Sequence, residues 1–155
     1  MLKKSVIKKI LLAVAAAGLG FVLLNLTFLF DALFQNLVRA VVGSFSSADP
    51  NMFRYPPMMH ILFVIIIGLI SWLVFRSKLA VFWKATYLFV PAATGLVTIG
   101  MFLYRWPFAV FSLGTILCLG VLYYFHRAKQ PWLYWYTLIL ISLVLVISWF
   151  LGAEI

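Results

Sequence analysis

Five long stretches of the chain consist almost entirely of apolar residues, and short polar intervals separate them. They lie at residues 10–30, 58–75, 85–104, 107–125 and 131–151. A helix rises about 1.5 Å per residue, so close to 20 apolar residues are needed to cross about 30 Å of hydrocarbon. A water-soluble domain of 155 residues would have too little polar sequence to cover five such helices. The pattern therefore predicts an all-α integral membrane protein, a bundle of five transmembrane helices that forms one transmembrane domain over residues 1–155.

The longest polar interval, residues 31–57, is itself partly periodic. Apolar residues recur at helical spacing between 33 and 42, and polar residues gather on the other side: Asp31, Gln35, Asn36 and Arg39. This periodicity predicts an amphipathic outer segment between the first and second spans. Two arrangements are open: the helix of the first span continues outward to Val42, or it breaks and lies along the membrane surface.

The distribution of charge predicts the orientation of the chain, whose formal charge is +9. If the N-terminus is cytoplasmic, nine of the 12 basic residues lie inside: Lys3, Lys4, Lys8, Lys9, Arg76, Lys78, Lys84, Arg127 and Lys129. Arg39, Arg54 and Arg105 then lie outside. The positive-inside rule thus predicts a multi-pass protein of the inner (cytoplasmic) cell membrane, with its C-terminus outside. Topology and contact with the lipid bilayer account for the basic excess, so no nucleic-acid partner is expected.

Several polar or helix-bending residues of the third span share one face, about 80° wide at 100° per residue. They are Tyr87, Pro91, Thr94, Gly95 and Thr98. Small and hydroxyl-bearing residues let neighbouring helices approach closely, which is the preferred interpretation. The first span carries a similar row of small residues: Ala13, Ala16, Ala17 and Gly20. The alternative is a hinge or a substrate-facing wall around Pro91, as in the broken helices of transporters.

A second group of candidate residues converges on the predicted outer boundary. It comprises Asp31, Arg39, Arg54, His60 and Arg105. Three guanidinium groups and an imidazole are suited to bind a carboxylate or phosphate group. The preferred alternative is that Asp31 pairs with Arg39 along one helix, while the other cations face water or lipid phosphates.

No ionisable residue is expected near the middle of a span, since Asp31 is placed at the outer boundary. This argues against a proton-coupled carrier and against acid–base hydrolysis within the membrane. The chain has one cysteine, Cys118, and no Cys or His cluster, so neither a metal site nor a cofactor is expected.

No motif in the chain specifies a reaction or a substrate, and three classes of function remain. The first is a non-enzymatic subunit or accessory protein that packs against another integral membrane protein. The second is a small transporter or channel for an amphipathic or anionic solute, and the third is an enzyme that modifies lipid headgroups. The first class is preferred because the spans carry few functional polar groups. The chain is therefore expected not to be an enzyme, and to associate with a membrane partner or with copies of itself.

Overall fold

The computed structural model describes residues 2–45 and 56–151. Their helices are α1 (Leu2–Phe45), α2 (Pro56–Arg76), α3 (Val81–Tyr87), α4 (Phe89–Leu103), α5 (Pro107–Arg127) and α6 (Trp132–Phe150). Four apolar helical segments are long enough to cross a membrane: 5–38, 81–103, 107–127 and 132–150. The apolar segment 60–76 of α2 is somewhat shorter. The prediction of an all-α membrane bundle of about five helices is thereby confirmed.

The helix of the first span continues through the amphipathic interval without a break. α1 is one helix of 44 residues that ends at Phe45. Of the two arrangements that the sequence left open, the continuous one is therefore correct. Residues 46–55 lie outside the described part of the chain.

The third span consists of two helices, α3 and α4, which meet at Leu88. Proline has no backbone N–H, so Pro91 cannot donate to the carbonyl of Tyr87 four residues earlier. The helical bonds on either side of this gap are kept: Leu88 N–H donates to Lys84, and Ala92 N–H donates to Leu88. Since Leu88 itself has right-handed helical angles, φ −56° and ψ −23°, α3 and α4 together form one interrupted span.

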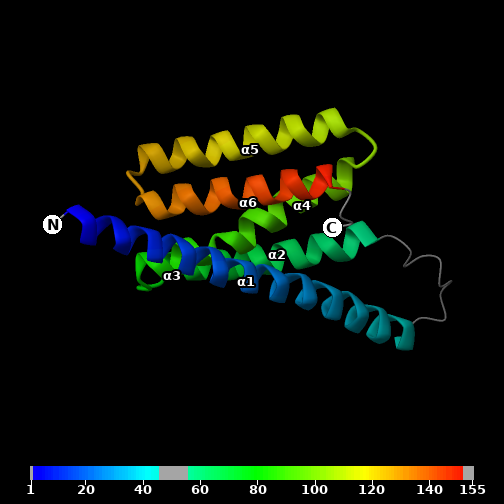
Figure 1. The fold of residues 1–155 in the computed structure, drawn as a ribbon. Coiled ribbons are helices and arrows are strands. Elements are labelled where there is room, and N and C mark those ends of the chain that lie inside the picture. Colours follow the sequence, from blue (N-terminus) through cyan, green and yellow to red (C-terminus); the bar gives the residue numbers. More distant parts are fainter. Residues whose placement is uncertain (1, 46–55, 152–155) are drawn as a thin grey trace.

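The helices run back and forth between two ends of the bundle (Figure 1). The start of α1, the α2–α3 connection and the α5–α6 turn lie at one end. The start of α2, the α4–α5 turn and the end of α6 lie at the other. The α4–α5 and α5–α6 turns are each followed by a proline at the start of the next helix. Pro107 begins α5, and Pro131 directly precedes α6, positions at which proline favours the start of a helix.

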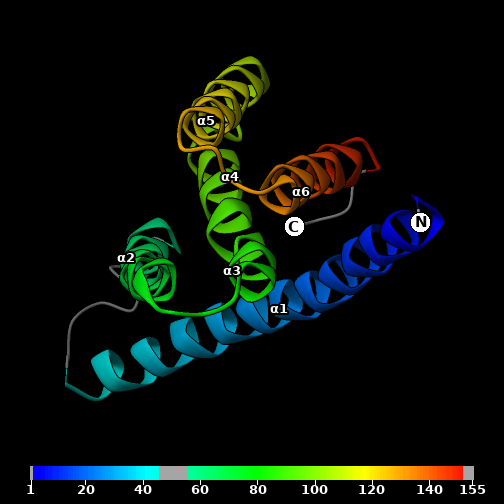
Figure 2. The same ribbon diagram turned by 90° about the vertical axis from the view of Figure 1, so that its left-hand side faces the viewer.

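α3 and α4 form the centre of the bundle. Viewed toward that first end, α2 and α6 flank the α3–α4 span on opposite sides, α1 crosses obliquely beneath it, and α5 lies above (Figure 2). α4 accordingly contacts all four of the other long helices. α5 contacts α4 and α6 and contributes one buried residue, Phe125, among those described.

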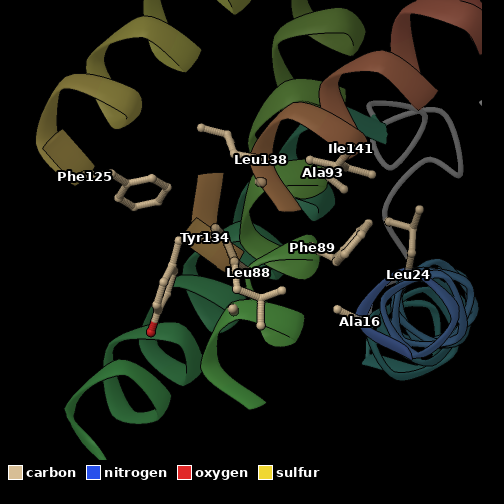
Figure 3. Packing of buried hydrophobic residues seen from close by; sticks show 12 residues of the cluster. Ala16, Leu24, Leu88, Phe89, Ala93, Phe125, Tyr134, Leu138 and Ile141 are labelled. Carbon is tan, nitrogen blue, oxygen red and sulfur yellow. The ribbon is translucent and has the colours of Figure 1, made fainter. Parts of the chain in front are cut away.

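The main core lies where α1, α3–α4 and α6 meet. Small residues of α1 allow this approach: Ala16 is fully buried and lies close to the ring of Phe89 (Figure 3). Leu138 and Ile141 of α6 are buried in the same cluster. This core fixes α4 relative to α1 and α6, and so determines where α4 presents its other face to α2.

Candidate functional site

A regular stripe of buried side chains on α2 brings a histidine into the bundle. His60, Phe63, Ile67 and Ser71 are spaced three or four residues apart and are all buried. Side chains at this spacing lie on one helical face, and α2 packs against α4 and α1. His60 is 3% exposed, so its imidazole lies among other helices instead of facing water.

The imidazole of His60 contacts one polar side chain on each of two neighbouring helices. Its Nε2 atom lies 3.0 Å from Oγ1 of Thr98 in α4. Its Nδ1 atom lies 3.4 Å from Oδ2 of Asp31 in α1, and the Asp31 side chain is 14% exposed. The three residues, here called the Asp31–His60–Thr98 site, therefore connect α1, α2 and α4.

The Thr98 hydroxyl is held by its own helix. It donates a hydrogen bond to the backbone carbonyl of Thr94, one turn earlier, at 2.5 Å. This is the usual back-bond of a helical threonine. Thr94 is buried as well, at 5% exposure.

Three phenylalanines pack beside the site. Phe30 and Phe34 of α1 and Phe63 of α2 have ring centroids 6.2–6.5 Å apart. The ring of Phe63 also lies 6.0 Å from that of His60. Among the described side chains that contact the imidazole, Asp31 and Thr98 are polar and Phe63 is apolar.

An apolar groove begins next to these rings and follows α1 toward the middle of the bundle. It has a volume of about 420 Å³ and is widely open to the surface of the bundle. Its walls come from α1, α2, α3 and α4: Leu23, Leu26, Thr27, Leu29, Phe30, Leu33, Ile67, Ile70, Tyr87 and Val90. The two polar side chains in this lining are already bonded, Thr27 to the carbonyl of Leu23 and Tyr87 to Ser71, 3.3 Å away. The groove therefore offers an apolar surface, and Asp31 lies on α1 between two of its wall residues.

The structure brings together members of both candidate groups predicted from the sequence. Asp31 and His60 come from the outer group, and Thr98 comes from the third-span group. Arg105 lies apart from this contact: its Nε donates to the hydroxyl of the adjacent Tyr104 at 2.9 Å, and it is exposed. Arg54 and the side chain of Arg39 lie outside the described residues. Among the described side chains, Asp31 has an ion-pair contact with His60; the expected pairing of Asp31 with Arg39 rests on a side chain outside the described residues.

The remaining third-span candidates have different neighbours. Pro91 lies at the interruption between α3 and α4 and is half-buried. A Cβ atom added to Gly95 would lie 4.0 Å from the side chain of Leu117, which is ordinary contact with α5. The glycine that permits a close approach between helices is Gly20 in α1, where an added Cβ atom would overlap the ring of Phe89 in α4.

Sequence reasoning missed the contact between Asp31 and His60, although part of the signal was available. The spacing of His60, Phe63, Ile67 and Ser71 places the histidine on the apolar, buried stripe of α2. That spacing does not tell which helix lies opposite. Asp31 can reach His60 because α1 continues past Phe30 as one helix.

The order hydroxyl, imidazole, carboxylate resembles a hydrolase triad in connectivity, but the geometry does not favour acyl transfer. A nucleophilic hydroxyl must give its proton to the imidazole, whereas Thr98 gives its proton to the carbonyl of Thr94. Thr98 also lies inside α4, where helical bonds occupy the nearby backbone N–H groups. The described part of α4 therefore provides no pair of free N–H donors for an oxyanion.

No cluster of three or more metal-ligating side chains occurs in residues 2–45 and 56–151. No protein-family model, curated protein or solved structure matches the chain. The chemistry of the Asp31–His60–Thr98 site and of the neighbouring groove must therefore be inferred from their own geometry.

Proposed function

We propose that this protein binds an amphipathic molecule in the membrane, as a small transporter for that molecule. The groove between α1 and α2 carries the proposal. Its volume of about 420 Å³ lies within the range of ligand pockets, about 300–1,000 Å³. Since its lining is almost entirely apolar and it is open to the surface of the bundle, its natural occupant in a bilayer is a hydrocarbon chain.

The length of the groove suits such a chain. From Leu23 to Leu33, α1 rises about 15 Å, which is half of the roughly 30 Å hydrocarbon thickness and so one leaflet. The Asp31–His60–Thr98 site lies near the outer end of the groove, where the polar part of an amphipathic molecule would lie. An amphipathic solute is thus favoured over a compact inorganic anion, since the groove wall offers no free cation among the described side chains.

The proposal includes an orientation and a location. The N-terminus lies in the cytoplasm, the C-terminus lies outside, and the protein resides in the inner membrane. The charge distribution supports this orientation, because seven of the nine basic residues on the proposed inner side flank the start of α1 and the α2–α3 connection: Lys3, Lys4, Lys8, Lys9, Arg76, Lys78 and Lys84.

Photolabelling tests the proposal directly. The purified chain in lipid nanodiscs would be exposed to a sixteen-carbon fatty acid that carries a diazirine group. We expect labelled peptides to cluster at residues 23–33 and 67–70. Leu26→Trp and Ile70→Trp fill the groove, since both side chains line it, and should each reduce the labelling of these peptides several-fold.

Ile116→Trp is the matched control, because Ile116 is an exposed apolar residue of α5 at 63% exposure, away from the groove lining. It should leave the labelling unchanged. Labelling spread evenly over all helices, or insensitive to the two groove variants, would contradict the proposal.

A second candidate, a non-enzymatic subunit that packs against another integral membrane protein, is supported by α5. This helix of 21 residues has Phe125 as its one buried residue among those described, while Ile116 and Leu119 are 63% and 59% exposed. Native mass spectrometry of the protein extracted from its own membrane distinguishes the two. A stoichiometric foreign subunit that Ile116→Trp displaces would favour this candidate, and a monomer with bound lipid would favour the transporter.

A further inference from the structure

A carboxylate borders the groove near its outer end. Asp31 follows Thr27 on α1 by four residues and lies between Phe30 and Leu33, and these three neighbours all line the groove. Residues four apart on a helix lie on one face, so Asp31 shares the groove-facing side of α1 with Thr27. Its side chain is 14% exposed. Among the described side chains of α1, Asp31 is thus the ionisable one that borders the groove.

The contacts within the protein leave this carboxylate partly unpaired. Its Oδ2 atom lies 3.4 Å from Nδ1 of His60. Its Oδ1 atom is buried and has no hydrogen-bond partner among the described residues, and the same holds for Nδ1 of His60, a residue that is 3% exposed. Buried polar atoms in proteins nearly always have a partner. These two atoms therefore call for a donor from outside the described part of the chain.

The carboxylate can turn toward the groove at little cost. Oδ1 is covered in this structure, so a ligand reaches it only when the Asp31 side chain rotates. The contact that this rotation loosens is the one with His60, whose 3.4 Å separation exceeds the usual hydrogen-bond distance of about 2.7–3.2 Å. Rotation of Asp31 thus gives up no short hydrogen bond among the described residues.

The described residues around Asp31 supply no cation for an anionic head group. Residues 56–75 of α2 and residues 85–104, which include α4, contain no Lys or Arg. Arg105 is exposed and donates to its neighbour in the α4–α5 turn. A carboxylate or phosphate head group would therefore meet the like charge of Asp31, which repels it. An ammonium or hydroxyl group instead donates a hydrogen bond to a carboxylate.

We propose that the groove selects single-chain amphiphiles whose head group donates hydrogen bonds and carries no negative charge, a primary amine or a hydroxyl, and that this head group binds to Asp31. The inference rests on the proposed function, because the hydrocarbon chain must occupy the groove for the head group to reach Asp31. An anionic amphiphile of the same length still fits the groove with its chain, but it gains nothing at Asp31 and binds more weakly.

Competition against photolabelling separates the head group from the chain. The fatty-acid probe described above reports occupancy of the groove. Three unlabelled sixteen-carbon competitors, an amine, an alcohol and an alkyl sulfonate, are compared at equal mole fraction in the nanodisc. We expect the amine and the alcohol to halve the labelling of residues 23–33 at about a tenfold lower mole fraction than the sulfonate, a ratio that one hydrogen bond to a charged group can provide.

Asp31→Asn tests the residue itself. The amide has the shape of the carboxylate but carries no charge and adds two donors, so the preference for the amine over the sulfonate should fall to about twofold or less. Arg105→Gln is the matched control. It removes an exposed charge at the same end of the bundle as the start of α2 and lies outside the groove lining, so the preference should remain about tenfold.

The outcomes distinguish this inference from the proposed function. Equal competition by the three amphiphiles, or a preference for the sulfonate, would overturn the inference and leave the groove as a chain-binding site. Absence of groove labelling by the probe would overturn both. An undiminished preference in folded Asp31→Asn would also overturn the inference. Because the three competitors are compared on the unaltered chain, that comparison decides even if Asp31→Asn does not fold.

Discussion

The ring of Phe89 lies directly against the backbone of Gly20, so that even a methyl group at this glycine would overlap it. Phe89 is 3% exposed and belongs to the core cluster that also contains Ala16 and Ile141. The contact sets the separation between α1 and α4. Because Asp31 lies three turns further along α1, the same contact helps to position the carboxylate opposite α2.

The first prediction concerns this contact. Gly20→Ala should destabilise the bundle by about 1–3 kcal/mol, because the added methyl group forces either the ring or α1 to move. Gly18→Ala is the control: it lies on the same helix with no atom within 4 Å of the added Cβ. There the change should be neutral or stabilising by up to about 1 kcal/mol, since alanine favours a helix. Equal effects in thermal or denaturant unfolding would show that the close approach does not matter.

A second prediction concerns Thr98. Thr98→Val keeps the shape of the side chain but removes the hydroxyl that lies 3.0 Å from Nε2 of the buried His60. We expect a loss of about 1–2 kcal/mol, above the average of about 0.6 kcal/mol for a hydrogen bond between membrane helices. Thr115→Val on the exposed side of α5 is the matched control. A loss no larger than in this control would mean that the contact between His60 and Thr98 does not stabilise the bundle.

A third prediction concerns the end of α2. The Nζ atom of Lys84 donates to the carbonyl of Phe75 at 2.8 Å, and so satisfies one of the last carbonyl groups of that helix. Lys84→Met should cost about 0.5–1.5 kcal/mol and should speed hydrogen exchange at residues 74–79. Lys78→Met, at an exposed position of the same connection, should change neither quantity. Identical exchange in the two variants would argue against the cap.

A fourth prediction tests the proposed orientation. The chain has one cysteine, Cys118, so Cys118→Ala provides a background for new single cysteines. Arg105→Cys in the α4–α5 turn should react with a membrane-impermeant maleimide in intact cells. Ala128→Cys in the α5–α6 turn should react only after the membrane is opened. Both positions are exposed. The opposite result would reverse the topology derived from the positive-inside rule.

The elements of this fold could be predicted because each depends on the sequence of one helix. The length of an apolar stretch determines whether it can cross a membrane, and so the spans from 107 to 125 and from 131 to 151 are close to α5 and α6. The helical spacing of Thr94 and Thr98 places both on one face of the third span, and both residues lie in α4.

The pairing of Asp31 with His60 could not be predicted in this way. Which helices are neighbours depends on side chains of several helices at once, such as the fit of Phe89 on Gly20. The sequence placed Asp31 at the outer boundary, just beyond the span 10–30, and left open whether the helix continued past it. With α1 continuous to Phe45, the carboxylate lies within the bundle, and a contact between α1 and α2 becomes possible.

The length of α1 should make the protein sensitive to the thickness of the bilayer. Its apolar segment, residues 5–38, has 34 residues and would extend about 51 Å if upright, well beyond a hydrocarbon thickness of about 30 Å. A helix with such an excess tilts, and the tilt changes with membrane thickness. α1 forms one wall of the groove, and α2 forms the facing wall. A thicker membrane should make α1 more upright and a thinner one should tilt it further, so the width of the groove, and with it the affinity for a hydrocarbon chain, should vary with the lipids that surround the protein.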